Sequence, residues 1–420
     1  MKCLYIVSSG PITPNGSGGG SAIYYDQMMA LRESGCDVHL WHFATTRDRL
    51  LFEENIGRDP ETWRRVQDTC SSIHLTTVEE SPPLAKRLHN RLAATIHRTP
   101  LVARWDYIRK LRQIVADIRP DFVWAHHLEA ATLSAQIRST PFIYFHHDWL
   151  YRIFAFRNGR PQNAVLKQRE EDISRSAFAV VTGSAYDRKE LLDLGCKRVR
   201  YIPVAYDPVA VDMADPEHKP RLVHLGGMGT TSNWQGLLSF FEKAWPNLAD
   251  QRFQLDVIGD IQQAPQSLAR HLKSVNCHGF VGDLSTVMRP YDLQIIPWNH
   301  PTGQRTKVPV AMNYAQVIIA CRGGVAGFEG LQSERNCILV DSVEEMPQAI
   351  RRAAENSELR MRLGKAAKAT FEKHFTRQVL LPRYQDLLGE LRGARVAQTD
   401  PGSQANSFMG QLQDNGRRIF

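Results

Sequence analysis

Strand and helix patterns alternate along the chain, and this alternation limits the possible folds more than any other feature. The apolar run KCLYIV leads into a glycine-rich turn, an amphipathic helical segment and a second apolar run, DVHLWHF. The later runs DFVWAHH, PFIYFHHD, FAVVTGS and VRYIPV continue the pattern. Because parallel strands need crossover connections, which are usually helices, this alternation predicts an α/β fold with a doubly wound parallel sheet.

The same alternation begins again in the second half of the chain. The apolar runs there are LVHLGG, FQLDVIGD, CHGFVG, DLQIIPW, VIIACRGG and CILVDS. A chain of 420 residues is also longer than one ordinary hydrophobic core requires. We therefore expect two Rossmann-like domains, each with a doubly wound parallel sheet, whose strand ends face each other across a cleft.

The composition along the chain places the domain boundaries. We expect an N-terminal domain over residues 1–203 and a C-terminal domain over residues 222–375. Between them, residues 204–221 hold prolines and acids without a long apolar run, which is typical of a linker. A C-terminal helix is expected over residues 376–393, with a crossing back to the N-terminal domain as one possibility. Residues 394–420 are polar and are expected to have no fixed fold.

Cysteine usage and hydropathy favour a cytoplasmic protein. The seven cysteines are scattered without a C-x-x-C pair, which argues against a disulfide framework and a zinc site. No apolar run approaches the roughly 20 residues that span a bilayer. The short apolar run after Lys2 indicates a first strand and not a secretion signal.

The net charge of +8 suggests an acidic partner, and part of the surplus is local. Residues 85–120 are rich in Lys and Arg, with apolar residues at roughly helical spacing. This pattern fits solvated helices, or an amphipathic face for anionic lipid headgroups at the inner face of a membrane. Nucleic acid is disfavoured because no recognised nucleic-acid-binding motif is present.

The stretch TGQRTKV places two cations, Arg305 and Lys307, two residues apart. In an extended segment both side chains would share a face. Arg can bridge two phosphate oxygens while Lys adds a point charge, so the pair suits the diphosphate of a nucleotide. The alternative is a solvated loop whose two cations have no ligand.

In each half of the chain, one glycine-rich turn follows the first strand. The first turn holds Gly18, Gly19, Gly20 and Ser21. It lies at a helix start, where backbone N–H groups favour an anion or polar group. The spacing is not G-x-G-x-x-G and no acid closes the second strand, which disfavours a dehydrogenase. In the second turn, Gly226 and Gly227 would let the backbone approach a ligand closely.

Histidine pairs stand at the carboxyl ends of two successive strands. His126 and His127 end one strand, and His146, His147 and Asp148 end the next. We interpret them as the polar lining of a substrate cleft. A zinc site and plain structural histidines are the alternatives, although successive strand residues point to opposite faces and cannot all converge.

Another turn, AGFEGL, places Glu329 and Gly330 after a buried strand. Glu329 could accept hydrogen bonds from ribose hydroxyls. A capping role at a helix start fits the spacing equally well.

Taken in order, these motifs resemble the GT-B-fold glycosyltransferases of the large retaining family, glycosyl transferases group 1, that includes sucrose synthase and bacterial mannosyltransferases. The resemblance covers residues 1–392. DFVWAHH resembles the family's D-x-x-H-x-H strand end at His126, and YFHHD resembles its t-x-H-D strand. GQRTKVPVAM is similar to the pattern G-t-R-x-K-x-x-E-A-m of one subgroup, and NWQG to the subgroup's N-x-x-G, which begins here at Asn233.

The resemblance implies transfer of a sugar from a nucleoside-diphosphate-sugar to a hydroxyl acceptor with retention, in polysaccharide, glycolipid or other glycoconjugate synthesis. It implies His126 near the reacting sugar, with Arg305 and Lys307 stabilising the leaving diphosphate in place of a metal. No cofactor is expected. The implied donor-side residues are Gly226, Gly227, Asn233, Gly303, Arg305, Lys307, Glu329 and Gly330. The implied acceptor-side residues are Gly18, Gly19, Gly20, Ser21, His127, His147 and Asp148.

One departure from the family pattern concerns the ribose. Val310 and Thr302 stand where the family has its two motif Glu residues. Glu329 or Asn313 could replace the lost contact. The alternatives are a degenerate, non-catalytic nucleotide-sugar-binding or assembly protein, and a nucleotide-sugar epimerase of the same fold. The acceptor itself could be a sugar, a lipid-linked sugar or a small molecule.

Overall fold

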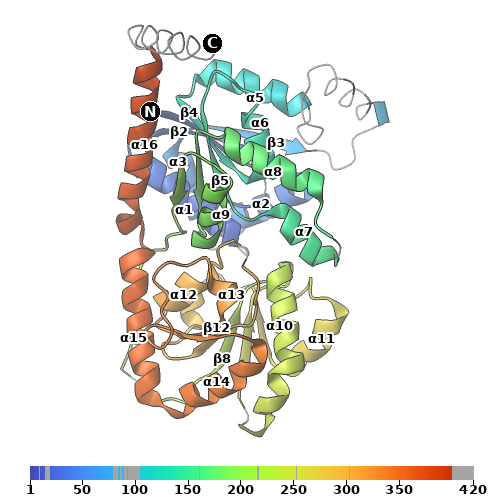
Figure 1. Ribbon diagram of the computed structural model, residues 1–420, viewed down its shortest axis with the longest axis vertical. Coiled ribbons are helices and arrows are strands. Elements are labelled where there is room, and N and C mark those ends of the chain that lie inside the picture. The colour runs from blue at the N-terminus through green and yellow to red at the C-terminus, as the bar shows by residue number, and fades with distance from the viewer. Residues whose placement is uncertain are drawn as a thin grey trace, which may run out of the picture.

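The protein is described by a computed structural model (Figure 1). It describes residues 1–8, 10–14, 19–78, 84, 85, 88, 92, 105–159, 161–214, 217–251, 253–301 and 303–399. Gly18, Thr302, most of the basic segment before residue 105 and the tail from residue 400 lie outside these ranges.

The N-terminal half forms a seven-stranded sheet in which every pair of neighbouring strands is parallel. Its strands are β1 (Lys2–Val7), β2 (Asp37–Thr45), β3 (Cys70–Val78), β4 (Phe122–His126), β5 (Phe142–His146), β6 (Ala179–Thr182) and β7 (Val199–Tyr201). The spatial order is β3-β2-β1-β4-β5-β6-β7, so the direction of strand addition reverses between β1 and β4. Ligands of doubly wound sheets bind beside such a reversal, at the carboxyl ends of the strands.

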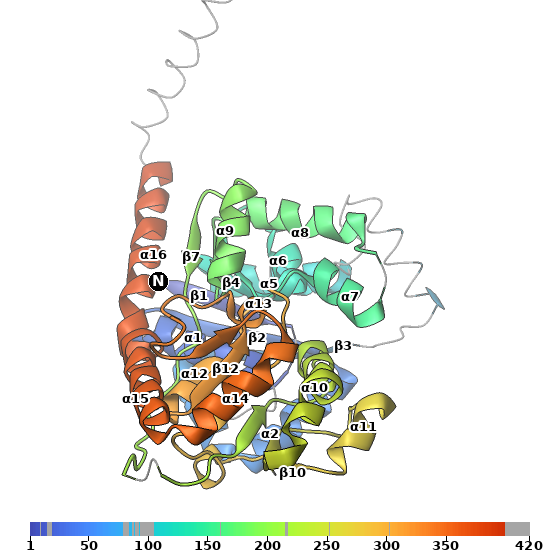
Figure 2. The same ribbon diagram turned by 60° about the horizontal axis from the view of Figure 1, so that its bottom comes forward.

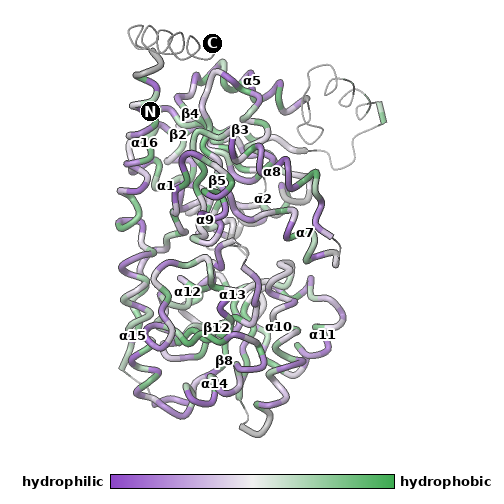
Figure 3. Tube along the Cα trace, in the orientation of Figure 1, coloured by the Kyte–Doolittle hydropathy of each residue, from purple (hydrophilic) through white to green (hydrophobic). Residues whose placement is uncertain are grey.

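Helices cover both faces of this sheet (Figures 1 and 2). They are α1 (Gly19–Glu33), α2 (Thr46–Arg58), α3 (Pro60–Thr69), α5 (Trp105–Ile118), α6 (His127–Ser134), α7 (Leu150–Asn158), α8 (Ala164–Ser176) and α9 (Ala185–Asp193). Because both faces are buried, the strands are nearly continuous apolar runs, as Figure 3 shows. Tyr5 and Trp124 point into one core and Ile6 and Ala125 into the other, as the alternation of strand side chains requires.

The C-terminal half repeats this topology with six parallel strands in the order β10-β9-β8-β11-β12-β13. They are β8 (Leu222–Leu225), β9 (Leu255–Ile258), β10 (Asn276–Gly279), β11 (Leu293–Ile296), β12 (Val317–Cys321) and β13 (Ile338–Val340). The helices are α10 (Thr231–Lys243), α11 (Gln266–Leu272), α12 (Lys307–Asn313), α13 (Arg322–Val325), α14 (Met346–Glu355), α15 (Ser357–His374) and α16 (Arg377–Thr399), with short 3-10 turns at Trp245–Gln251, Leu284–Thr286 and Val343–Glu345. The predicted fold, two doubly wound parallel α/β domains, is confirmed.

The chain passes between the domains twice. The first passage is the segment after β7, and the second is the junction of α15 and α16, which brings α16 alongside α1 (Figure 1). The two passages touch, because the Tyr206 N–H donates to the Phe375 carbonyl oxygen at 3.0 Å. The Asp26 carboxylate of α1 is buried beside both: it accepts from the Ala205 N–H at 3.1 Å and from Arg377 Nε at 3.0 Å.

Helix α16 belongs to the core of the N-terminal domain although it follows the C-terminal domain in sequence. Its buried side chains there are Leu380, Tyr384, Leu387, Leu388 and Leu391. The helix continues to Thr399. Residues 394–399 are therefore helical, which corrects the prediction that fixed structure ends at residue 393; the end of one apolar helical face does not end the helix.

Most of the described part of the basic segment is helix α5, whose apolar residues Tyr107, Ile108, Leu111 and Ile114 are buried in the N-terminal core and are not available to a lipid surface. Leu88 and Leu92, earlier in the same segment, are exposed. Among the described residues, no helix is both long enough and apolar enough to cross a membrane.

Candidate active site between the domains

A cavity of about 780 Å³ lies between the carboxyl ends of the two sheets. Its walls come from both domains. Of the residues that the sequence singled out, the cavity is lined by Gly20, His147, Asp148, Gly226, Gly227, Asn233, Arg305 and Lys307. The fold thus brings together groups that lie more than 280 residues apart in the chain, Gly20 and Arg305 among them.

The turn after β8 forms part of the cavity wall and requires glycine. Gly226 has φ +131°, and a Cβ there would lie 3.0 Å from Cγ of Asn233. Asn233 Nδ2 donates to the Gly227 carbonyl oxygen at 2.9 Å, so this side chain holds the turn in shape. Gly259, after β9, packs against the same backbone, since a Cβ on it would lie 2.7 Å from the Gly227 nitrogen. The sequence predicted the close approach at Gly226 and Gly227 but not the bracing by Asn233 and Gly259.

Arg305 enters the cavity from the turn that begins α12. One guanidinium nitrogen donates to Ser232 Oγ at the first turn of α10, and the guanidinium carbon lies 5.8 Å from the Trp298 ring centroid. The backbone here is not the extended segment that the sequence argument assumed. Thr306 has helical angles and the Val308 N–H bonds to the Arg305 carbonyl oxygen at 2.9 Å, so Arg305 and Lys307 share the cavity because a helix starts between them.

Lys307 is the first residue of α12 and is only 8% exposed. Burial, and secondly the positive charge of Arg305, lower the pKa of the Lys307 ammonium from 10.5 to about 7. Among the described residues, no carboxylate offsets these two effects on Lys307. An anionic ligand would supply the missing charge.

Asp148 and His147 face this pair from the N-terminal domain. Burial raises the pKa of the Asp148 carboxyl to about 6, and the charge of Arg305 partly offsets the effect. Gly303 touches this wall from the other domain, since a Cβ on it would lie 2.6 Å from Cγ of Asp148 and 2.7 Å from the His147 carbonyl oxygen. With φ +44°, Gly303 is therefore required by close interdomain packing, and it does not line the cavity. This corrects its expected place on the donor side.

Three of the four strand-end histidines converge, and one does not. His126 pairs in register with Phe145, so its ring lies on the same face as Tyr5, while His146 points to the opposite face and lies 4.0 Å from Asp187. His127 joins the first group because its backbone has φ +66°, an uncommon value for a residue with a side chain. Among the described residues, no three His, Cys, Asp or Glu side chains are grouped as metal ligands.

His126 does not occupy the position that the family resemblance implied. It is 0% exposed and does not line the cavity. Both ring nitrogens are engaged: Nε2 lies 2.6 Å from the Tyr5 hydroxyl and Nδ1 lies 3.1 Å from His147 Nε2. The cavity wall at this point is His147, whose ring stacks on His127 with centroids 3.9 Å apart.

Burial lowers the pKa of every imidazole in this group, to about 4 for His127 and well below the ordinary value for His126 and His147. All three rings are therefore neutral near pH 7. The Tyr24 hydroxyl is hydrogen-bonded to Nε2 of His127 and so closes the cluster on the α1 side.

Glu329 and Gly330 lie away from the cavity, which corrects their expected donor-side place. Glu329 is exposed, and its backbone N–H faces the Tyr201 hydroxyl at 3.5 Å. Gly330 packs near the His374 ring at the start of the second passage between domains. The local sequence could not show that this turn faces the interdomain junction.

Asn313 lines the cavity, but its side-chain amide is already hydrogen-bonded to the backbone of the linker. Its Oδ1 accepts from the Val209 N–H at 3.0 Å and its Nδ2 donates to the Asp207 carbonyl oxygen at 2.9 Å. Lys368 Nζ also donates a hydrogen bond to Asn313 Oδ1, at 2.8 Å. These bonds disfavour Asn313 as a replacement for the missing ribose contact.

Part of the cavity wall is apolar. It is formed by Leu225, Ile258, Leu284, Val310 and Tyr314, which pack together as one small cluster. Val310 is therefore part of an apolar wall where the family pattern has a carboxylate. Such a surface suits the flat faces of an aromatic base.

The remaining predicted residues form the turn at the start of α1. Gly20 lines the cavity, and Ser21 is buried with 5% exposure. Gly19 is the first residue of α1, and Gly18 lies outside the described residues. The functional neighbours that the sequence argument missed are Tyr5, Tyr24, Ser232 and Trp298. Tyr5 and Trp298 sit inside or beside apolar runs, where a residue type alone indicates only core packing.

Two protein-family models match the chain. The glycosyl transferase 4-like domain matches residues 18–207, and glycosyl transferases group 1 matches residues 219–356. The two matches correspond to the two halves of the structure and meet near the linker. No curated protein matches the chain at a significant level.

Several solved structures share the whole two-domain architecture. Sucrose-phosphate synthase from Thermosynechococcus elongatus is 15% identical with a TM-score of 0.68, covering 94% of this chain and 99% of its own. HepE from Anabaena, solved in complex with UDP, is 16% identical with a TM-score of 0.64, covering 93% and 100%. TarM of S. aureus, solved with UDP and α-GlcNAc-glycerol, is 9% identical with a TM-score of 0.65, covering 92% and 99%. At these identities the likeness shows the fold.

Proposed function

The chain belongs to the retaining group 1 glycosyltransferases of the GT-B fold, which use nucleotide-sugar donors, and we propose that it moves a hexose from a nucleoside diphosphate to a hydroxyl acceptor in polysaccharide, glycolipid or other glycoconjugate synthesis. The observation that carries the proposal is the pair of cations, half-buried Arg305 and buried Lys307, in a cavity shared by both domains.

Arg305 and Lys307 hold the diphosphate in this proposal. As the bond to the sugar breaks, negative charge develops on the leaving phosphate, and fixed cations in a water-poor cavity stabilise it strongly. Two side-chain cations here supply the charge that metal-dependent transferases obtain from a divalent ion. Ser232 and the Trp298 ring keep the Arg305 guanidinium in place.

The donor lies along the C-terminal wall, with the base at the apolar part beside Ile258 and Tyr314 and the phosphates beside the Gly226–Gly227 turn. The sugar then faces His147 and Asp148 of the N-terminal domain. The acceptor enters past the start of α1, near Gly20. This order places the breaking bond between the cations and the acceptor side, so that closing the domains aligns the reactants.

Substitution of the cations tests the diphosphate site. Arg305→Ala and Lys307→Ala should each weaken UDP binding by about 10- to 150-fold, since a hydrogen bond to a charged group contributes about 1.5–3 kcal/mol. Arg322→Ala is the matched control, because Arg322 is exposed and pairs with Asp341 outside the cavity. Calorimetric titration measures the affinities. A double variant that binds UDP as tightly as the unaltered protein would remove this site from the proposal.

The donor nucleotide can be identified by a thermal-shift screen. UDP is the first candidate because HepE, a structural neighbour, has been solved with UDP-glucose. GDP-, ADP- and dTDP-sugars complete the screen. A ligand at about 100 times its dissociation constant adds about 2.7 kcal/mol to the free energy of unfolding, which is readily seen as a shift in Tm.

A non-catalytic nucleotide-sugar-binding protein is the second candidate, and Val310 in the apolar wall favours it. The two functions differ in product. A transferase releases nucleoside diphosphate faster when an alcohol acceptor is added, whereas a binding protein shows a Tm shift with the donor and no release. The lipid-surface proposal for residues 85–120 rests mostly on residues outside the described ranges, and vesicle co-sedimentation with and without anionic lipid tests it.

A further inference from the structure

The indole ring of Trp298 has neighbours from both domains. Trp298 follows β11 in the C-terminal domain and is only 6% exposed. The Arg305 guanidinium carbon lies 5.8 Å from its ring centroid. From the N-terminal domain, the Phe156 ring of α7 meets it almost at a right angle, with the centroids 5.7 Å apart, and the exposed His300 lies 4.8 Å from both rings. The side chain that holds Arg305 is therefore also a contact between the domains.

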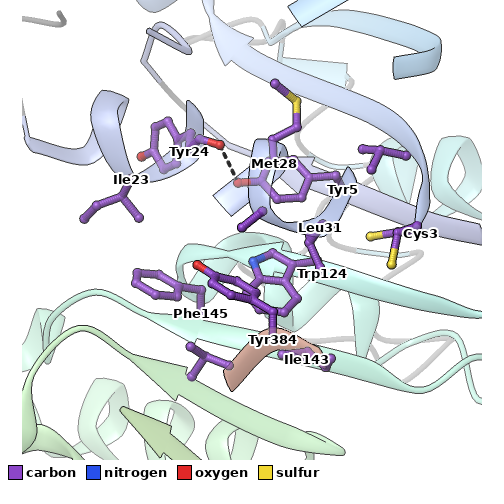
Figure 4. Close-up of a cluster of buried hydrophobic side chains, with 14 of the residues drawn as sticks. Cys3, Tyr5, Ile23, Tyr24, Met28, Leu31, Trp124, Ile143, Phe145 and Tyr384 are labelled. Carbon is purple, nitrogen blue, oxygen red and sulfur yellow. Dashed lines mark hydrogen bonds between the residues drawn. The ribbon is translucent and has the colours of Figure 1, made fainter. Parts of the chain in front are cut away.

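Helix α7 is fixed to the N-terminal domain, so Phe156 moves with that domain. The strand before it, β5, is anchored in the core, where the Phe145 side chain packs (Figure 4). At the start of α7, the two oxygens of the buried Glu170 carboxylate accept from the first two N–H groups of the helix, at 2.9 and 3.0 Å. Further along, the Arg152 guanidinium donates to both oxygens of Glu190, each at 2.8 Å.

The backbone of Trp298 is held just as firmly on the C-terminal side. A Cβ on Gly236 of α10 would lie 3.2 Å from the Trp298 nitrogen, and one on Gly324 of α13 would overlap the Trp298 carbonyl oxygen. Because close packing on two sides prevents the backbone from shifting, the indole ring can move only by rotating about its side-chain bonds. Phe156 lies against the ring and limits this rotation.

We infer that Phe156 is a positioning residue for the diphosphate site: while the two domains are in contact, it braces the Trp298 ring and so fixes the Arg305 guanidinium for an incoming diphosphate. An arginine loses side-chain freedom when it binds a ligand, and a neighbour that already orders it reduces this cost. When the N-terminal domain moves away, α7 withdraws and the ring loses this brace. The inference rests on the proposed function for the presence of a diphosphate, but the effect of Phe156 on Arg305 does not depend on it.

The same contact gives a diphosphate a way to draw the domains together. None of the described residues of α7 lines the cavity, so a ligand there does not touch the helix. Coupling between two equilibria is reciprocal, however. A ligand that orders Arg305 also orders the Trp298 ring, and an ordered ring favours the contact with Phe156.

NMR of the ligand-free full chain tests the step from Phe156 to Arg305. With ¹⁵N-labelled arginine, the Arg305→Lys variant assigns the Arg305 Nε–H signal, whose position responds to the ring current of Trp298. We expect Phe156→Ala to move this signal. Phe154→Ala is the matched control, because Phe154 is 44% exposed and two residues away on the same helix, so the two rings do not share a face. An unmoved Arg305 signal in Phe156→Ala would overturn the inference whether or not the protein is a transferase.

UDP and uridine together test the link to the diphosphate. Phe156→Ala should weaken UDP binding by about 2- to 10-fold, because the coupling cannot exceed the contribution of one aromatic pair. The affinity for uridine, measured by NMR titration, should not change, since uridine has no phosphate. Phe156→Leu keeps an apolar side chain without a ring and should show the same difference, so a folding defect of the Ala variant would not decide the result. Equal losses for UDP and uridine would overturn the inference, because Phe156 would then act on the packing as a whole.

A double-mutant cycle identifies the route. In the Trp298→Leu background, Phe156→Ala should have no further effect on the affinity for UDP, because the connection from α7 to Arg305 is already broken. A loss of affinity that persists in this background would mean that Phe156 acts without the ring, and the inference would be wrong. If UDP, GDP, ADP and dTDP all fail to bind the unaltered protein, the proposed function fails, while the NMR result decides the contact by itself.

Discussion

Binding of UDP should weaken as the pH rises above 7, because Lys307 loses its proton there. Burial is the larger cause of its low pKa of about 7, and the Arg305 charge adds to it. The sign follows from the charge of the ligand: a diphosphate beside the ammonium favours the protonated form, so binding raises the pKa of Lys307. Above pH 7 the free protein must therefore take up a proton in order to bind.

The size of the effect depends on how far the pKa of Lys307 in the UDP-bound protein lies above its pKa in the free protein. If the bound pKa returns toward the ordinary 10.5, the affinity for UDP falls about tenfold for each pH unit between 7 and 9. The ionisation of the ligand itself changes little over this range, because a terminal phosphate with a pKa of about 6 is already about 90% ionised at pH 7. Proton uptake should approach one proton per UDP at pH 9.

Isothermal titration calorimetry in two buffers with different ionisation enthalpies measures both quantities. Lys307→Met should bind UDP more weakly at pH 7 and show no uptake in this range. Lys243→Met is the matched control, because Lys243 is exposed and paired with Glu344. An affinity that stays flat from pH 7 to 9, or an uptake that persists in Lys307→Met, would refute the reasoning.

Three further substitutions test the packing of the two domains, the position of the ribose and the buried ion pair of Asp26. Gly303→Ala should lower both Tm and the rate of UDP release, because the added methyl would overlap the carboxylate wall of the other domain; thermal unfolding and donor hydrolysis measure the two effects, and an unchanged Tm would mean that the domains do not pack this closely in solution. Val310→Glu should strengthen UDP binding by about tenfold by returning a carboxylate to the ribose end, and an unchanged Kd would place the ribose elsewhere. Asp26→Ala should lower the free energy of unfolding by about 3–5 kcal/mol, since Arg377 then loses its buried carboxylate, whereas Glu33→Ala at the exposed side of the same cation should cost at most about 1 kcal/mol; equal losses in denaturant titrations would contradict this ranking.

The fold could be predicted from the sequence because each strand leaves a local signal. Apolar runs such as KCLYIV and LVHLGG end in glycine turns, and a parallel sheet buried on both faces needs this pattern in every strand. The end of helix α16 could not be placed in the same way. Its last turns, near Ala394, lack an apolar face, and a helix that is already nucleated can continue without one.

The candidate site was predictable only where one short segment supplies the chemistry. Arg305 and Lys307 are two residues apart, so any compact local structure keeps them together. The histidines differ, since His126 lies behind the cavity wall against the Tyr5 hydroxyl, whereas His147, at its other side, lines the cavity. Glu329 was predicted to lie on the donor side because its glycine-flanked turn resembles the family's motif, but the fold places this turn away from the cavity. Contacts of this kind join residues that are far apart in the chain, so they cannot be predicted from the spacing of residues in the sequence.

The return of α16 to the first domain has a consequence for the order of events during synthesis. Five buried side chains of the N-terminal core, from Leu380 to Leu391, leave the ribosome only after the whole C-terminal domain. The second domain has its own complete core by about Phe375, so it can fold while the first is still missing a helix. The N-terminal domain is thus first in sequence and last to be completed. A chain that ends before residue 380 would hold a finished C-terminal domain beside an open apolar groove, the state in which this chain most needs a chaperone.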